Sequence, residues 1–398
     1  MNTDRYYRVG FVLHSNLWVG GQNYLKNLFA AIHALPYSVI KPVVFTGTKA
    51  DIKFAEFPRV EVIRTRILDH KGSAWFLREG IGKVTKYDFW LRRLLRRHHV
   101  SALSHLFSLR SRLPVPTIGW IPDLQHVYLP EFFSVEERKR RDREFMELCV
   151  NCDKVIVSSE CAGIDLQSFA PEYTYKTELL RFVGSPVLPQ QSIHLQELQK
   201  IYGFEGPYFL LPNQFWAHKN HRVVISALNL LKSKNKRVLV LATGSTQDYR
   251  HPTFFSSLMQ YAGECGVLDA FRVLGQIPYD HLVALMQHAI ALINPSRFEG
   301  WSSTVEEAKS IGKQIVLSDI PVHREQAPQR CFFFPPDDPD ALADQILAAL
   351  NQFDQRHEAL MQEAASAQFS ARQKAYGERY EQIVLDVLKN LNSNSSMS

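Results

Sequence analysis

Short apolar segments alternate along the chain with longer stretches in which apolar residues recur at helical spacing. This alternation is typical of parallel βαβ units, in which each strand is followed by a helix that packs against the sheet. The expected strands form two groups of six, so the sequence predicts an α/β protein with two doubly wound, Rossmann-like domains. The strands are 8–14, 39–45, 60–65, 101–106, 117–121 and 154–159 in the first group, and 208–212, 237–243, 271–275, 289–295, 314–319 and 331–336 in the second.

The two groups are separated by segment 184–192, whose sequence GSPVLPQQS is rich in Pro, Ser and Gly and has no periodic apolar residues. Such a composition is typical of a linker between domains. We therefore expect a first domain over 1–186 and a second over 187–368. A long helix over 369–390 follows the second sheet, and packing across the first domain is one placement open to it. Residues 391–398 are expected to form a flexible tail.

Functional residues are expected in the loops that follow the strands. In doubly wound folds ligands bind beyond the carboxyl ends of the strands, and two such domains that face each other form a cleft. The loop after the first strand contains Gly20 and Gly21, directly before an amphipathic helix. Two glycines allow the backbone to approach a ligand closely, and a helix start offers N–H groups to a phosphate. A simple tight turn is the alternative, and the pattern G-x-G-x-x-G of a dinucleotide fold is absent.

The second domain begins with another strand, polar loop and helix over 208–228. Lys219 precedes the helix, where its ammonium group suits a diphosphate, and the amides of Asn213 and Gln214 suit hydrogen bonds nearby. The alternatives are a solvated lysine at 219 and a helix cap at Asn220.

The segment 294–313, NPSRFEGWSSTVEEAKSIGK, is the most informative part of the chain. It follows a strand and leads into a helix, and it places Glu299 and Glu307 with seven residues between them. A carboxylate accepts two hydroxyl groups well, so this pair suits the recognition of ribose and hexose better than the binding of a metal ion. A charged helix start favoured by the helix dipole is the alternative for the bare spacing.

The composition is that of an ordinary soluble globular protein, with 45% hydrophobic and 22% charged residues over 398 positions. It excludes collagen-like and wholly disordered proteins, and the length suits two or three domains. No apolar run approaches the roughly 18 residues of a membrane span, and the first residues do not resemble a secretory signal peptide. We therefore expect a cytoplasmic protein, with peripheral contact at the inner face of a membrane as its only membrane association.

The positive charge is unevenly distributed. The net charge is +6, with +8 over residues 1–186 and −2 over 187–398, so an anionic surface would be met by the first half. Within that half, the run 86–100 resembles a basic amphipathic helix, and with the preceding aromatic residues it suggests docking on an anionic bilayer through residues 71–99. A helix packed on the protein core is the alternative. The apolar face consists of Leu91, Leu94 and Leu95, and the basic face of Arg92, Arg93, Arg96 and Arg97.

Two patterns that suggest metal or redox chemistry have simpler explanations. Cys149 and Cys152 form C-x-x-C, but no second pair completes a zinc set, so buried thiols are favoured. The five cysteines are odd in number, which favours a reducing compartment. Asp338 and Asp340 form D-x-D, yet Asp338 precedes Pro339 as a helix cap precedes a first-turn proline. We therefore expect no metal site.

Taken in order, these motifs resemble glycosyltransferase family 4, the retaining enzymes of the glycosyltransferase B fold. The resemblance covers nearly the whole chain and is strongest from about 205 to 340, where PSRFEGWSSTVEEA is followed by SIGKQIVLSDIPVHRE. The strings IPDLQH, LPEFFS and HKNH favour a bacterial polysaccharide subgroup. The implied architecture is two Rossmann-like domains that face each other across a cleft.

The resemblance implies a role for each motif. Glu299 would contact the donor sugar, Glu307 would hold the ribose hydroxyls, and Lys219 would neutralise the leaving diphosphate. Gly20 and Gly21 would approach that diphosphate from the first domain. The base would be met near Gln276 and Ile277, and amides or hydroxyls for the sugar and diphosphate would come from Gly300, Trp301, Ser302, Ser303 and Thr304.

Two positions depart from the family pattern. Many members carry an Arg five residues before the loop lysine, where this chain has Gln214, and Arg297 is the candidate to replace its charge. Many also carry a His-Asp pair in the first domain, where this chain has Pro122 followed by Asp123. His126 lies three residues further on, and either it or Asp123 takes the place of the usual histidine.

The leading functional hypothesis is the metal-independent transfer of a hexosyl unit, with retention of configuration. The donor is a nucleoside-diphosphate sugar, the acceptor is a saccharide that is expected to be lipid-linked, and no other cofactor is implied. The rival hypothesis is a degenerate, non-enzymatic protein that binds nucleic acid or an anionic membrane. It rests on a pI near 8.9 and on the two departures. Because the chain carries no nucleic-acid-binding motif, we expect no nucleic-acid partner.

Overall fold

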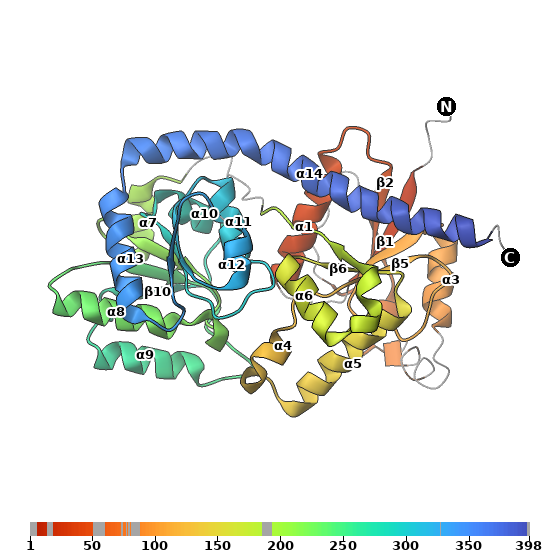
Figure 1. Ribbon diagram of the computed structural model, residues 1–398, viewed down its shortest axis with the longest axis horizontal. Helices are drawn as coiled ribbons and strands as arrows, with labels where there is room; N and C mark the ends of the chain where they lie inside the picture. The colour runs from red at the N-terminus through yellow and green to blue at the C-terminus, as the bar shows by residue number, and fades with distance from the viewer. Residues whose placement is uncertain are drawn as a thin grey trace. The chain divides into compact units, whose positions relative to one another are not determined.

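The computed structural model describes residues 6–13, 19–50, 60–72, 75, 76, 78, 80, 88–184, 193–326 and 328–395. The chain forms two compact units, each built on a parallel sheet, and Figure 1 shows the helices that cover the sheets. The predicted α/β class is therefore confirmed. The first unit consists of Met1–Leu124, Val135–Phe182 and Ala371–Ser398, and the second of Gln125–Ser134 and Val183–Ser370.

The sheet of the first unit has seven parallel strands in the order β3-β2-β1-β4-β5-β6-β7. Six of them were expected from their apolar runs. The seventh, β7, has the sequence TEL and pairs with β6 from Val155 to Val157, without an apolar run of its own. The strands are β1 (Tyr7–Leu13), β2 (Ile40–Thr46), β3 (Glu61–Arg64), β4 (Ala102–Leu106), β5 (Thr117–Trp120), β6 (Lys154–Val157) and β7 (Thr177–Leu179).

Helices cover both faces of this sheet. On one face, apolar residues of α3, α5 and α6 form a continuous core with β2, β4 and β6. On the other face, Phe11 of β1 packs edge-to-face on Phe29 of α1, with ring centroids 4.9 Å apart, and lies 6.4 Å from the ring of Tyr380 of α14. The helices are α1 (Val19–His33), α3 (Phe89–Arg97), α5 (Val135–Asn151), α6 (Glu160–Phe169) and the second part of α14 (Gln355–Ser395).

The sheet of the second unit has six parallel strands in the order β10-β9-β8-β11-β12-β13, all of them expected from the sequence. Burial on both faces explains why these strands are nearly continuous apolar runs. They are β8 (Phe209–Pro212), β9 (Val240–Thr243), β10 (Phe271–Gly275), β11 (Leu292–Asn294), β12 (Ile315–Ser318) and β13 (Cys331–Phe334).

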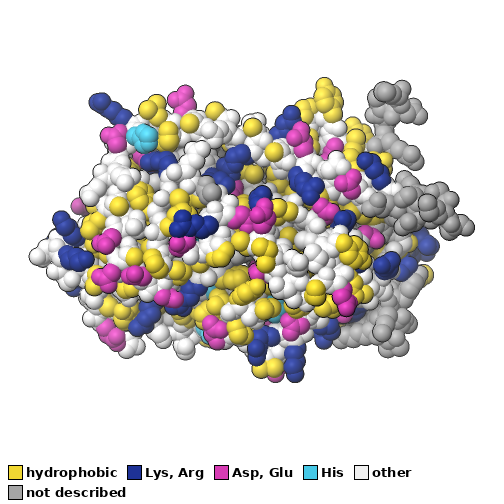
Figure 2. All heavy atoms as spheres, in the orientation of Figure 1, with side chains coloured by type: hydrophobic (Ala, Val, Ile, Leu, Met, Phe, Trp, Pro, Cys, Tyr) yellow, Lys and Arg dark blue, Asp and Glu magenta, His cyan; other side chains and the backbone are white. Residues whose placement is uncertain are grey.

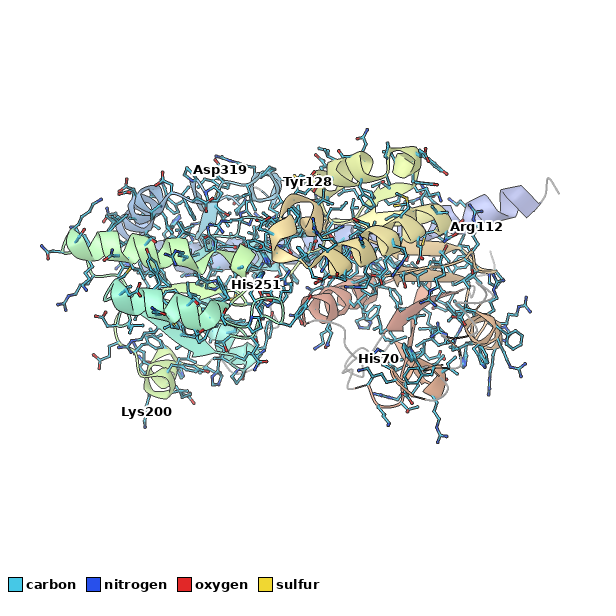
Figure 3. All side chains as sticks on the ribbon, turned by 90° about the horizontal axis from the view of Figure 1, so that it is seen from below. His70, Arg112, Tyr128, Lys200, His251 and Asp319 are labelled. Atoms are coloured by element: carbon cyan, nitrogen blue, oxygen red, sulfur yellow. The ribbon has the colours of Figure 1, made fainter. Side chains whose placement is uncertain are left out.

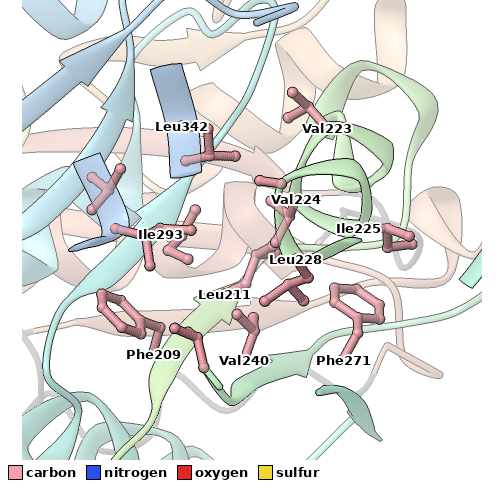
Figure 4. Packing of buried hydrophobic residues seen from close by; sticks show 14 of the residues in the cluster. Phe209, Leu211, Val223, Val224, Ile225, Leu228, Val240, Phe271, Ile293 and Leu342 are labelled. Atoms are coloured by element: carbon pink, nitrogen blue, oxygen red, sulfur yellow. The ribbon is translucent and has the colours of Figure 1, made fainter. Parts of the chain in front are cut away.

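Two hydrophobic cores lie on the two faces of the second sheet. Phe209 and Leu211 of β8 point into one core with α8, α9 and α13, which Figure 4 shows from close by. Tyr208 and Leu210 belong to the other core with α7, α10 and α11, as the two-residue period of a strand requires. The helices are α7 (Leu195–Tyr202), α8 (His221–Ser233), α9 (Phe254–Glu264), α10 (Tyr279–His288), α11 (Ser303–Ser310), α12 (Pro321–Gln326) and α13 (Pro339–Gln352).

Helix α14 contributes to both units. In the second unit, the buried Glu358 pairs with Lys313 at 2.7 Å and with Arg330. In the first unit, Glu381 accepts a hydrogen bond from the Ser38 hydroxyl at 2.5 Å. The helix expected over 369–390 is thus part of a longer one, and residues 391–395 of the expected tail are helical. The linker expected over 184–192 lies, except for Gly184, outside the described residues.

The basic amphipathic helix is α3, and its apolar face packs on the core of the first unit. Leu91 is 5% exposed and Leu95 is fully buried, while Leu94 packs against the same cluster. The expected insertion of this face into a bilayer is therefore corrected, because the face packs on the core. Only the positive charge of the arginine face is left to attract an anionic surface. Much of the rest of 71–99 lies outside the described residues.

Surface charge is mixed on the face that Figure 2 shows, where Lys and Arg side chains lie among Asp and Glu. In the part of the chain that the structure describes, no helix is long and apolar enough to cross a membrane.

The two simpler explanations for the cysteine and aspartate patterns are confirmed. Cys149 and Cys152 are buried free thiols, and burial raises their pKa values to about 11 and about 12. Asp338 caps α13, since its carboxylate accepts a hydrogen bond from the Ala341 amide at 2.9 Å, and Pro339 follows in the first turn.

The contact between α14 and α1 gives a test of the first unit. A Cβ atom at Gly377 would lie 2.6 Å from the carbonyl oxygen of Ala31. We expect Gly377→Ala to lower the midpoint of thermal unfolding, although alanine favours a helix by about 1 kcal/mol over glycine. The control is Gly163→Ala in α6, where the added Cβ meets only Val157 at 3.8 Å, and its midpoint should rise. Equal shifts in the two variants would contradict this packing.

Candidate functional site

The candidate site lies at the carboxyl ends of β8 and β11, where the strand order of the second sheet reverses direction. Such a switch point is where open α/β sheets bind ligands. Asn213 follows β8 and Asn294 ends β11, and the Asn213 amide donates a hydrogen bond to Asn294 Oδ1 at 3.1 Å. Both side chains are buried, so this bond fixes the two loops relative to each other.

Asn294 is also bonded to the segment that follows it. Its Nδ2 donates to Ser302 Oγ at 2.8 Å, and the Ser296 hydroxyl lies 2.7 Å from Asn294 Oδ1. The same hydroxyl lies 2.7 Å from Glu299 Oε1, so its single proton serves one of the two acceptors at a time. The turn that carries Glu299 is thereby tied to the end of the strand.

Lys219 and Glu299 form an ion pair across this edge. Their Nζ and Oε1 atoms are 2.6 Å apart, and the side chains are only 14% and 10% exposed. Lys219 ends a short 3-10 helix over Ala217–Lys219, after which Asn220 adopts a left-handed conformation with φ 55°. The alternative of a solvated lysine at position 219 is therefore excluded. The side-chain amide of Asn220 donates to the Pro336 carbonyl at 2.7 Å, and this side chain makes no capping hydrogen bond to α8.

Glu299 is held in its ionised form. Burial opposes ionisation, but the positive charge of Lys219 and the hydrogen bonds from Lys219 and Ser296 together lower the pKa of Glu299. An ionised carboxylate carries no proton to donate, so it can only accept hydrogen bonds, for example from hydroxyl groups.

His323 was not among the residues singled out from the sequence. It lies in α12, five residues after Ser318, and its Nδ1 donates to the Ser318 carbonyl at 2.9 Å. This bond leaves Nε2 as an acceptor in the neutral ring. Burial lowers the pKa of His323, and the negative charge of Glu299 opposes that shift, which places the ring within the field of the ion pair. His323 follows β12, the strand beside β11, and this position after a strand is the sequence signal that could have marked it as a site residue.

Glu307 lies in the second turn of α11 and faces α10. The Tyr279 hydroxyl donates to Glu307 Oε1 at 3.3 Å, which ties the two helices together. Burial raises the pKa of Glu307 to about 7, and the bond from Tyr279 opposes the rise. Gln276 and Ile277 lie just before Tyr279, in the turn between β10 and α10.

The residues between Glu299 and Glu307 differ in whether their polar groups are bonded inside the unit or exposed. The Ser302 amide donates to Gln326 Oε1 at 3.0 Å, and its hydroxyl caps α11. The Thr304 hydroxyl donates to Asn213 Oδ1 at 3.3 Å and is buried. Both side chains therefore stabilise the turn from inside the unit. Gly300 and Trp301 are partly exposed, and Ser303 is exposed.

Gln214, at the position where the family resemblance leads us to expect an arginine, makes a structural hydrogen bond. Gln214 Oε1 accepts a hydrogen bond from the Ser245 amide at 2.8 Å, which links the loops after β8 and β9. Arg297 pairs with Asp337 at 2.7 Å in an exposed ion pair. A second cation near the Lys219 turn is Arg250. Burial lowers the pKa of His218, and the positive charges of Lys219 and Arg250 lower it further.

The remaining predicted residues are distributed over the two units. Gly20 and Gly21 lie in the first turn of α1, in the first unit. Asp123 belongs to the same unit, where Arg141 approaches its carboxylate to 4.0 Å. His126 is buried and belongs to the second unit, together with the rest of 125–134. Among the described residues, no three His, Cys, Asp or Glu side chains are grouped as metal ligands would be.

Comparison with known sequences finds a family match within the second unit. Residues 196–366 match the family model of glycosyl transferases group 1. The O-antigen chain mannosyltransferase RfbU of Salmonella typhimurium is 26% identical over 224 residues, which cover 55% of this chain and 56% of that protein. The chain thus matches a little over half the length of this relative.

Comparison with solved structures shows the glycosyltransferase B fold. A glycosyltransferase from Rickettsia africae aligns with a TM-score of 0.67 at 16% identity, over 97% of this chain and 99% of that one. The Anabaena protein HepE, crystallised with UDP-glucose, aligns with a TM-score of 0.64 at 14% identity, over 99% and 100% of the two chains. The predicted glycosyltransferase B fold is therefore confirmed.

The raised pKa of Glu307 makes stability depend on pH. Its ordinary pKa is about 4.3, and in the folded protein it is about 7. The stabilising contribution is therefore complete below the ordinary pKa and is lost as the pH rises through 7. We expect Glu307→Gln to raise the unfolding midpoint relative to wild type more at about pH 8 than at about pH 5. Glu363→Gln, at an exposed position of α14, is the control, and a difference that is equal at both pH values would contradict the raised pKa of Glu307.

Proposed function

We propose that this chain, a glycosyltransferase by its group 1 domain over residues 196–366, moves a hexosyl unit from a nucleoside-diphosphate sugar to a saccharide hydroxyl. The observation that carries the proposal is the buried Lys219–Glu299 pair at the switch point of the second sheet. It combines a fixed cation with a carboxylate that accepts hydroxyl groups, and these are the two groups that a sugar diphosphate requires.

Lys219 is the residue that stabilises the leaving diphosphate. Its charge is balanced by Glu299 at 2.6 Å. A diphosphate brings negative charge that grows as the sugar departs, and a cation already fixed beside it stabilises that charge without reorganisation. Glu299 holds the ammonium in place and accepts hydroxyls of the donor sugar. It is thus a recognition residue, and retention of configuration is implied by the family resemblance alone.

The nucleoside lies toward Glu307 and the turn after β10. Glu307 accepts the ribose hydroxyls, and the contact with Tyr279 at 3.3 Å holds its carboxyl group toward the helix that follows this turn. Gln276 and Ile277 then lie beside the base. Support comes from the position of the turn at the carboxyl end of β10, on the same edge of the sheet as Lys219.

The transfer proceeds without a metal ion in this proposal. Asp338 of the D-x-D sequence caps α13 through its carboxylate, which supports a structural role for this motif. Lys219 and backbone amides near Gly300 then stabilise the diphosphate. Gly20 and Gly21 lie in the first turn of α1, whose backbone amides suit a phosphate.

The acceptor is a growing, lipid-linked saccharide in polysaccharide or lipopolysaccharide synthesis. Support comes from the relative of Salmonella typhimurium, which is named an O-antigen chain mannosyltransferase. A membrane contact at the cytoplasmic face would rest on the exposed arginines of α3, because the leucines of that helix are used in the core. The residue that takes the place of the usual family histidine is Asp123 of the first unit or His126 of the second unit.

A thermal-shift panel of nucleotide sugars tests the function directly. GDP-mannose, UDP-glucose, ADP-glucose and dTDP-glucose are compared, because a ligand that binds only the folded state raises the midpoint. We expect one of them to raise it and to be hydrolysed slowly in excess EDTA. Loss of hydrolysis in EDTA that Mg²⁺ or Mn²⁺ restores would overturn metal independence. Salt-sensitive binding of nucleic acid, without any nucleotide-sugar binding, would instead favour the non-enzymatic hypothesis.

The two glutamates should respond differently to substitution. Ribose hydroxyls are bound equally before and during transfer, so we expect Glu307→Gln to raise the donor KM by about tenfold with little change in kcat. Glu299→Gln should mainly lower kcat, since Lys219 loses the carboxylate that positions it. Steady-state kinetics with the donor found in the panel measure both effects, with Glu363→Gln as the control. Equal losses of kcat at unchanged KM would contradict these roles.

A further inference from the structure

A short segment interrupts the first unit and belongs to the second. Gln125–Ser134 lies in sequence between β5 and α5 of the first unit, yet its contacts place it in the second unit. It contains the helix α4 (Gln125–Tyr128) and a 3-10 helix over Pro130–Phe132. Figure 3 labels Tyr128 on this segment and His251, which precedes α9.

Aromatic and cationic contacts hold this segment on the second unit. The ring of Phe132 meets His251 edge-to-face at 5.8 Å, and the Arg250 guanidinium lies 5.0 Å from the ring centre of Phe133. Arg250 also lies 5.2 Å from the ring of Trp216, three residues before Lys219. Its Nε pairs with Asp248 at 3.3 Å, and these two side chains are 7% and 1% exposed. A buried pair of this kind keeps the guanidinium in one position between the rings.

The other end of the segment lies against the residue before Glu299. The rings of Tyr128 and Phe298 are stacked, with centroids 5.8 Å apart and an interplanar angle of 24°. Tyr128 is 50% exposed, while Phe298 is partly buried. The half-exposed ring of Tyr128 is thus stacked on Phe298, the residue directly before Glu299.

We propose that Tyr128 and Phe298 form a platform for a pyranose ring of the saccharide acceptor. The apolar C–H face of a pyranose packs on the face of an aromatic ring, and the tyrosine hydroxyl offers a hydrogen bond at its edge. The inference rests on the proposed function, because it places the acceptor beside the donor sugar at Glu299. The nucleotide is bound by other elements, namely α10, α11 and the loop after β8.

The position of the platform fixes the distance between the acceptor and the donor sugar. Tyr128, Phe298 and Glu299 all belong to the second unit, so the spacing between acceptor platform and donor carboxylate is set within one folded body. A transfer reaction requires its two reactants at a fixed separation, and an error of about 1 Å is costly. The segment 125–134 therefore supplies acceptor specificity from the donor-binding unit.

The test compares binding of simple glycosides with binding of the nucleotide. The probes are the methyl α-pyranosides of mannose, glucose, galactose and rhamnose, measured by saturation-transfer NMR with GDP or UDP present. We expect Tyr128→Ala to weaken glycoside binding by about fivefold or more, and Tyr128→Phe to retain it. Phe298→Leu should also weaken it, and nucleotide affinity should stay unchanged in all three. Tyr37→Ala, at a tyrosine that is 92% exposed in the first unit, is the matched control.

The outcomes separate this inference from the proposed function. If wild type binds a nucleotide but none of the glycosides, or if Tyr128→Ala binds the glycoside as well as wild type, the platform is wrong and the donor site stands. If wild type binds no nucleotide and hydrolyses no nucleotide sugar, the proposed function itself fails. A loss of nucleotide binding in Tyr128→Ala would also overturn the platform, since it would place Tyr128 in the donor site.

Discussion

The hydrogen bonds of the Asn294 amide are the constraint on which the candidate site depends. They join the end of β11 to Asn213 after β8 and to Ser302 at the start of α11. A buried amide must have its partners, so displacement of any one of these loops would leave polar atoms unpaired in the interior. Glu299 and Lys219 are carried by the loops that this network fixes, and their separation is therefore a property of the sheet rather than of two mobile side chains.

The strands of both sheets could be predicted because burial on two faces gives each one an apolar run. The short strand β7 lacks such a run, and its place follows from pairing with β6. The separate motifs of Lys219 and Glu299 could also be predicted, but their pairing across 80 positions could not. It depends on β8 and β11 lying side by side, which is decided by the strand order and not by any local pattern.

Local patterns were also insufficient where one pattern fits two environments. Leucines at helical spacing opposite arginines describe α3 equally well on a membrane or on a core, and only the neighbouring strands decide between them. Residues 125–134 show the same limit. Nothing in their sequence indicates that they leave the first unit, because the contacts that hold them come from Arg250, His251 and Phe298, which are more than 100 positions away.

The shared helix α14 has a consequence for synthesis on the ribosome. The first unit requires residues 371–395, whereas the second is complete by residue 370. The second unit can therefore fold before the first, although most of the first emerges earlier. Until α14 is made, the face of the first sheet around Phe11 lacks the packing that Tyr380 provides. Chaperones that shield exposed apolar surfaces during translation would thus act chiefly on the N-terminal part of the chain.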